Sequence, residues 1–232
     1  MACNAGVSDT NVRVQSVNAM VGPTDLDHKR GFAAAAILTG LLSLVLVFAT
    51  AQAPPKPGTY LQSFSQHRGA YIAVAVLLVT WAVIAIPFVV SVGQTLRARG
   101  AVLASAGVLL SAVGIALLGF GSFASIGAFM ALSAAGGPPA PGEAEYQATI
   151  WWNLSFFLSD PALMTWGLGF LLFGKLAWRS GILPNWLAVL GLIGGLAGLL
   201  TLAVYRTPML ALLQVMCFAV WAITVGVKLL KK

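Results

Sequence analysis

Asp160 is the residue of this sequence best suited to carry chemistry, because it is the one carboxylate inside a strongly apolar stretch. If that stretch crosses a membrane, an ionisable group there is costly and suggests a function. Asp160 could then carry a proton, hold a cation, or pair with Arg206, which is expected near the same side. The sequence favours a structural role, a helix cap or a kink, because Ser159-Asp160-Pro161 is typical of a helix start.

Further polar residues lie near Asp160 or in the apolar runs that follow it. They are Asn153, Ser155, Ser159, Thr201, Tyr205 and Gln214. With Asp160 and Arg206 they could line a small polar cavity that opens outward and binds an ion, a proton or a ligand. Polar side chains in membrane helices more often form hydrogen bonds to neighbouring helices or to their own backbone. The sequence therefore favours a role in helix packing, and the polar cavity is the alternative interpretation.

The sequence offers no residue pattern for catalysis or for a bound cofactor. His28 and His67 are expected at opposite faces of a membrane, so they cannot share a metal or a haem. Cys3 lies in a polar segment and Cys217 in an apolar run, which gives neither a disulfide framework nor a metal site. There is no Ser–His pair, no His–Glu metal motif and no mid-span lysine. We therefore expect no catalytic residue, no metal and no cofactor, and an enzyme is the least favoured class.

The composition places these residues in a membrane. Of 232 residues, 59% are hydrophobic and 8% are charged, and the mean hydropathy is +0.91. Soluble domains carry about 25% charged residues, which they need to cover an apolar core. The net charge of +7 comes from short basic clusters between apolar runs. Anionic lipid headgroups are the expected partners of such clusters, and nucleic acid is not.

Six apolar runs alternate with polar or Pro- and Gly-rich segments. This pattern predicts an all-α integral membrane protein, a six-transmembrane-helix bundle. Residues 1–29 are expected to form a polar cytoplasmic tail, and residues 30–232 a single transmembrane domain. The predicted spans are about 31–53, 69–92, 101–133, 150–178 with a break near 160, 186–205 and 209–230.

Two of the predicted spans are unusual in length. The third apolar run is far longer than the roughly 20 residues that suffice to cross. One long tilted helix is the simpler interpretation, and a break near 119–121 is the alternative. The fourth is expected to start at Pro161, since 18 residues from there to Trp178 cover about 27 Å. Residues 150–153, with two tryptophans, would then lie at the outer interface.

Basic residues predict the orientation, since Lys and Arg are enriched in cytoplasmic segments. One side of the predicted membrane collects ten of them: Arg13, Lys29, Arg30, Arg97, Arg99, Lys175, Arg179, Lys228, Lys231 and Lys232. The other side collects Lys56, Arg68 and Arg206. We therefore expect both the N and C termini to be cytoplasmic. This agrees with an even number of spans, which puts both termini on the same side.

Small residues predict where the helices pack, because apolar helices in lipid associate through close backbone approach. The third span carries a stripe at heptad spacing: Gly107, Ser111, Gly114, Gly121, Ser125 and Ala128. The fifth carries two overlapping pairs: Gly191 with Gly195, and Gly194 with Gly198. These two spans are expected at the centre of the bundle. The stripes fit packing within one chain better than a dimer interface, since six helices have ample internal surface.

The segment Trp178-Arg179-Ser180-Gly181-Ile182-Leu183-Pro184-Asn185-Trp186-Leu187 has its own interpretation as a short cytoplasmic hinge. Gly181 would end one helix and Pro184 would start the next turn. With the glycine-rich run from Gly191, it resembles a bacterial family of multi-pass proteins catalogued as domain of unknown function 4386. The resemblance runs from about Arg30 to the end of the chain and departs at Asn185, where the family usually has a basic residue. It implies a six-helix protein of the bacterial inner membrane, and brings no substrate or catalytic residue.

Together these patterns favour a non-enzymatic membrane module. It would act as an accessory or scaffold subunit, or as a binder of a lipid-like ligand, in the bacterial cytoplasmic (inner) membrane. Its expected partners are membrane lipids, and other membrane-protein subunits or a second copy are further candidates. The alternative is a small transporter or channel that uses Asp160.

Overall fold

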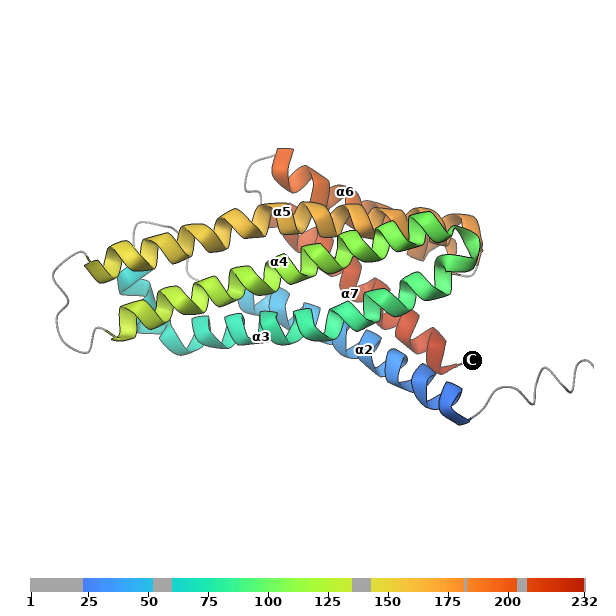
Figure 1. Ribbon diagram of the computed structural model, residues 1–232, viewed down its shortest axis with the longest axis horizontal. Coiled ribbons are helices and arrows are strands. Elements are labelled where there is room, and N and C mark those ends of the chain that lie inside the picture. The colour runs from blue at the N-terminus through green and yellow to red at the C-terminus, as the bar shows by residue number, and fades with distance from the viewer. Residues whose placement is uncertain (1–22, 52–59, 135–142, 182, 204–207, 232) are drawn as a thin grey trace, which may run out of the picture.

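The structure, a computed structural model, describes residues 23–51, 60–134, 143–181, 183–203 and 208–231. All regular structure in these ranges is helical. The α-helices are α2 Pro23–Ala51, α3 Tyr60–Leu96, α4 Ala101–Ala134, α5 Glu143–Ser180, α6 Asn185–Ala203 and α7 Pro208–Leu230, and a short 3-10 turn, η2 Arg97–Arg99, joins α3 to α4 (Figure 1).

Each helix packs against its neighbours in the chain, and the last helix returns to the first. The extensive contacts are α2 with α3, α3 with α4, α4 with α5, α5 with α6, α6 with α7, and α7 with α2. Short connections between long apolar helices make antiparallel neighbours the natural arrangement. The described helices therefore form a closed ring in chain order.

Basic side chains gather at one end of this ring, called the basic end below. The start of α2, the turn at η2, the turn between α5 and α6 and the end of α7 all lie there (Figure 1). The described basic residues in these parts are Arg30, Arg97, Arg99, Lys175, Arg179, Lys228 and Lys231. The opposite end is called the outer end.

Five of the helices contain an apolar stretch long enough to cross a membrane: α2, α3, α4, α5 and α7. The described apolar stretch of α6, Asn185–Thr201, falls just short of that length. Since apolar side chains cover the outside of the described helices as well as the inside, the chain is a multi-pass membrane protein.

The three longest helices extend past the others. The helices α3, α4 and α5 have 37, 34 and 38 residues, which is well beyond the roughly 20 needed to cross a bilayer. They continue together at the outer end beyond α2, α6 and α7 (Figure 1). These extensions are called the outer arms.

One of the predicted boundaries needs correction. The break in the fourth span is wrong as a helix start, because α5 runs without interruption from Glu143 to Ser180 with Pro161 inside it. The α2 helix begins at Pro23, inside the predicted polar tail, and its apolar stretch starts at Arg30, next to the expected start near 31. Proline suits the first position of a helix, which explains where α2 begins. Residues 1–22 of the predicted tail lie outside the described part of the chain.

Two other local predictions are confirmed. The third apolar run forms one continuous helix, α4, without a break at 119–121. The hinge also has the expected form, since Gly181 follows the end of α5 with a φ of +63°, a conformation that favours glycine. The next helix then starts directly after Pro184, whose carbonyl accepts from the amide of Leu187 at 2.9 Å.

Candidate functional site: an apolar cavity inside the helix ring

Aromatic side chains fill the interior of the ring near its middle. Trp81, Trp166, Phe170, Phe218 and Trp221 are all buried there. The rings of Trp166 and Phe218 lie 4.8 Å apart and those of Trp81 and Trp166 lie 5.3 Å apart, both edge to face. Edge-to-face pairs at such distances add attraction beyond the burial of their area. This aromatic cluster joins α3, α5 and α7 and fixes their spacing.

A cavity of about 440 Å³ lies next to the aromatic cluster. Residues from α2, α3, α4, α5 and α7 line it, and all of them are aliphatic or tryptophan. Trp81 and Trp166 belong to both the cluster and the cavity wall, and Leu118, Leu163 and Leu212 lie on other parts of the wall. An apolar cavity of this size stands in the range of small-molecule sites, about 300–1,000 Å³.

The two tryptophans of the wall differ in their hydrogen bonds. The indole Nε1 of Trp81 donates to Ser43 Oγ at 2.8 Å, and that hydroxyl donates in turn to the Thr39 carbonyl at 2.8 Å. The indole Nε1 of Trp166 is buried and has no acceptor among the described residues. A buried unpaired donor costs about 1–3 kcal/mol. Because the Nε1 atom is itself buried, this cost falls on the packed interior and not on the open surface of the cavity.

Gln214 serves to hold helices together inside the ring. It is fully buried on α7, and its Nε2 donates to the Leu163 carbonyl of α5 at 3.1 Å. Its side chain also lies against Gly198 of α6, where an added Cβ would come within 2.7 Å of Oε1. No described residue donates to that Oε1. The amide of Gln214 therefore connects α5, α6 and α7. A side chain larger than that of glycine at position 198 would collide with it.

The other predicted polar residues do not form a common site within the described chain. Asn153 is exposed on α5, and the Ser159 hydroxyl donates to the Ser155 carbonyl at 2.7 Å. The Ser155 hydroxyl lies 2.8 Å from that of Ser125 and so joins α5 to α4. Arg206 and Tyr205 were candidates for the alternative polar cavity, and both lie outside the described residues.

Asp160 is half-buried in the interior of α5, so it does not cap a helix start. Steps of seven residues keep nearly the same side of a helix, with a drift of about 20°. Asp160 therefore shares a side of α5 with Gly167 and Gly174, and both of these glycines contact α6. The carboxylate lies beyond that contact, toward the outer end.

The small-residue stripes of α4 and α6 pack on two different sides of α5. On one side, an added Cβ at Gly107 would come within 2.8 Å of Phe173, and one at Gly114 within 2.6 Å of the Ala162 carbonyl. Gly121 approaches the Ser155 carbonyl, and Ser111 lies against Gly169. On the other side, Gly191 meets Gly174, and Gly195 meets Leu171. The third and fifth spans, α4 and α6, were predicted at the centre of the bundle. The structure instead has α5 between them, in contact with both.

A family comparison adds to this geometry. The model of the family described as Domain of unknown function (DUF4386) matches residues 32–232, which is most of the chain. The chain belongs to the DUF4386 family. No curated protein and no solved structure matches it.

The DUF4386 match covers every residue that lines the cavity, from Leu46 on α2 to Val215 on α7. It also covers the hinge at Gly181, on which the resemblance rested. The family description names no substrate, so the chemistry of this DUF4386 chain must be argued from its own residues.

The positions of the tryptophans in the sequence are a signal for the aromatic cluster beside the cavity, and the sequence interpretation did not use it. Tryptophan in membrane proteins is enriched at the two interfaces. Trp178 and Trp186 fit that rule, since they are exposed at the basic end. Trp81 and Trp166 depart from it, because each lies well inside an apolar stretch. A tryptophan in mid-span marks the interior aromatic cluster of this DUF4386 protein.

Proposed function

We propose that this membrane protein binds one lipid-like molecule in the cavity beside Trp81 and Trp166. The observation that supports this proposal is the cavity itself, about 440 Å³ with a wholly aliphatic and tryptophan lining. Lipid tails are as apolar as this lining, so a lipid-like ligand would be held by close van der Waals packing as it fills the cavity.

The lining favours a binding role over catalysis or ion transport at this site. No ionisable side chain is among the lining residues, whereas transporters generally build a midplane site from several polar groups and from broken helices. The described helices α3, α4 and α5 pass the cavity without a break. A bound lipid would also serve an accessory or scaffold role, because it would hold α2 and α7 against the long helices.

The setting of this function is proposed to be the cytoplasmic membrane of a bacterium, crossed six times with both termini inside. The gathering of basic residues at one end supports this orientation. The α6 helix has 19 residues, about 28 Å at 1.5 Å per residue. This length is close to the hydrocarbon thickness of about 30 Å, which supports a sixth crossing.

The test is gentle purification followed by native mass spectrometry for bound small molecules. Leu118→Trp places a larger side chain in the cavity wall, and Leu109→Trp makes the same change at an exposed site of the same helix. We expect the wild-type protein and Leu109→Trp to carry a lipid, and Leu118→Trp to lose at least about tenfold in occupancy. Equal lipid content in all three proteins would overturn the proposal.

Proton or ion transport through Asp160 is a second candidate, and one observation favours it. Since α5 is continuous, the half-buried carboxylate is not explained as a cap. We expect Asp160→Asn to abolish proton-dependent flux in liposomes while the melting temperature is kept, and Asn153→Ala to leave both unchanged. A fall in melting temperature without any loss of flux would assign Asp160 a structural role.

A further inference from the structure

A second, smaller pocket lies at the basic end, away from the cavity beside Trp81. Its volume is about 90 Å³, and it lies between α3 and α7, with Leu183 from the hinge at its edge. The two helices make no extensive contact with each other. Trp221 separates the pocket from the rest of the interior, since it lines the pocket and also packs against Phe88 and Phe170.

The lining of this pocket is apolar on one part and polar on another. Val92, Leu96 and Val225 supply buried aliphatic surface. Ser91, Thr95 and Lys228 supply polar atoms. Both hydroxyl protons are already donated one turn back, from Ser91 to the Phe88 carbonyl at 2.7 Å and from Thr95 to the Ser91 carbonyl at 2.9 Å. Lys228 is therefore the one ionised donor among the lining residues.

The charges around the pocket favour an anion. The exposed Arg97 and Arg99 follow α3 directly, and Lys231 follows α7. No ion pair joins Lys228 to a carboxylate among the described side chains. A half-buried lysine beside further basic residues attracts an anionic group, more strongly in a low dielectric.

We propose that this pocket binds the head of an anionic amphiphile, with a phosphate or carboxylate at Lys228 and the first part of an acyl chain on Val92, Leu96 and Val225. The site suits an amphiphile because the basic end is also where the spans meet the membrane surface. Lipid headgroups lie at that level, and Val92, Leu96 and Val225 offer buried aliphatic surface to the first part of a chain. This site is separate from the cavity of the proposed function and does not depend on it.

A lysine at this position also has a simpler, structural role, and the experiment must distinguish that role from ligand binding. Cations stabilise the last turn of a helix, and long lysine side chains reach for the membrane surface from inside it. Loss of Lys228 could therefore lower stability without any ligand. Selectivity between headgroups is a readout that this simpler role does not change.

The experiment is native mass spectrometry of the purified full chain, titrated separately with phosphatidylglycerol, phosphatidylcholine, dodecanoate and inorganic phosphate. The variants are Lys228→Gln and the matched control Lys231→Gln, an exposed lysine at the same end outside the pocket. We expect the wild-type protein to prefer phosphatidylglycerol and dodecanoate to phosphatidylcholine. Lys228→Gln should weaken binding of the anionic probes by about tenfold or more, and Lys231→Gln by less than about twofold.

Thr95→Trp provides a second variant that keeps the lysine. Thr95 is exposed at the pocket, so the larger ring closes the site with little effect on the core. It should reduce phosphatidylglycerol binding as strongly as Lys228→Gln does. An equal loss in Lys231→Gln, or full binding in Thr95→Trp, would show diffuse surface attraction and overturn the site. Displacement of the lipid by millimolar inorganic phosphate would overturn the acyl part of the proposal.

Discussion

A single buried amide shows how polar groups are used in this protein. Gln214 was expected to serve helix packing, with an outward-facing polar cavity as the alternative, and it lies in the interior, bonded to the Leu163 carbonyl and packed on Gly198. In a membrane the exchange of hydrogen bonds with water is absent, so a side-chain amide gains by finding a backbone partner on another helix. Trp81 likewise finds a partner on another helix, because its indole N–H donates to the Ser43 hydroxyl of α2.

The pair of Gly198 and Gln214 gives a prediction at this scale. Gly198→Ala should lower stability by about 1–3 kcal/mol, because the added Cβ meets the amide of Gln214. Gln214→Ala should also destabilise, since it removes a hydrogen bond and leaves a void. The double variant should be more stable than the sum of the two effects, because the new methyl group occupies the vacated space. A double-mutant cycle of melting in detergent measures this coupling, and simple additivity would contradict the described contact.

The helix α5 is the element around which the others are arranged. Its two packed sides receive the small-residue stripes of α4 and α6, and its side chains contribute to both the aromatic cluster and the cavity. Ser155, Ser159, Ala162 and Trp166 follow one another on the side that faces α4, at heptad spacing. This continuous contact explains why α5 passes through Ser159-Asp160-Pro161 without ending.

Removal of the internal proline tests the continuity of α5. Proline inside a helix removes one backbone hydrogen bond and costs about 3 kcal/mol. We therefore expect Pro161→Ala to raise the melting temperature measured in detergent. If the helix began at Pro161, the proline would be favourable there, and the same variant would leave the melting temperature unchanged or lower it.

The α4–α5 contact makes a second prediction for an element. Gly114→Ala should destabilise the protein by about 1–3 kcal/mol, because the methyl group would meet the backbone of α5 at Ala162 and Trp166. Gly31→Ala is the matched control, since its added Cβ meets nothing within 4 Å. In a helix that control should be neutral or stabilising by up to about 1 kcal/mol. Thermal melts of both variants check the difference, and equal melting temperatures would contradict the close approach.

The sequence allowed the helices to be predicted better than their arrangement. The lengths of the apolar runs and the residues of the Gly181–Pro184 hinge predicted the positions of most helices, because both depend on the local sequence alone. The return of α7 to α2 and the cavity between them were not predicted. In lipid the outside of a helix is as apolar as its inside, so periodicity no longer tells which side is buried. The start expected at Pro161 failed for a related reason, since packing along α4 outweighs a local signal.

At the scale of the whole molecule, the orientation can be tested by labelling from one side. The basic end should face the cytoplasm, and the outer arms should face away from it. With Cys3 and Cys217 replaced by serine, we introduce cysteine at Tyr146, which is exposed on the outer arms, or at Lys231. A membrane-impermeant maleimide added to intact cells should label Tyr146→Cys and spare Lys231→Cys until the cells are opened. The reverse pattern would invert the proposed topology.

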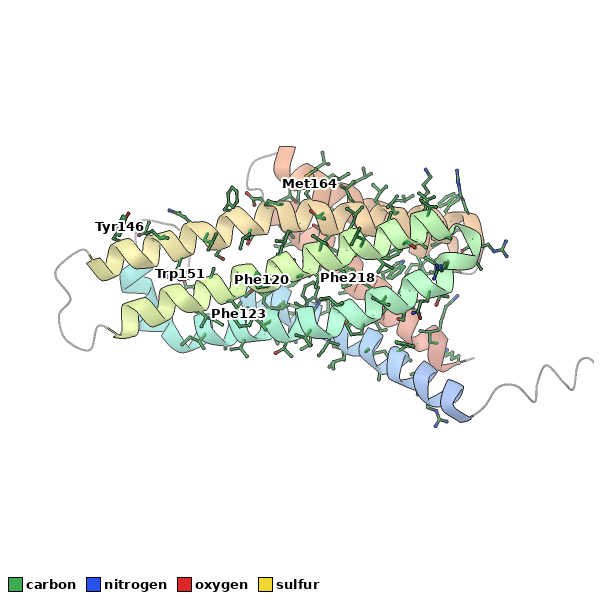
Figure 2. All side chains as sticks on the ribbon, in the orientation of Figure 1. Phe120, Phe123, Tyr146, Trp151, Met164 and Phe218 are labelled. Carbon is green, nitrogen blue, oxygen red and sulfur yellow. The ribbon has the colours of Figure 1, made fainter. Side chains whose placement is uncertain are left out.

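The unequal lengths of the helices have a consequence for the surrounding lipid. The apolar stretch of α5, Thr149–Ser180, has 32 residues, about 48 Å at 1.5 Å per residue, whereas the whole of α6 is about 28 Å long. The outer arms carry exposed apolar side chains, among them Phe123 on α4 and Trp151 on α5, so their surface stays apolar beyond the ends of the shorter helices (Figure 2). A bilayer of uniform thickness cannot match both sides of this protein, and it must thicken beside the arms or the arms must tilt. Such hydrophobic mismatch would place the protein preferentially at borders between thin and thick membrane, with its long side toward the thicker region.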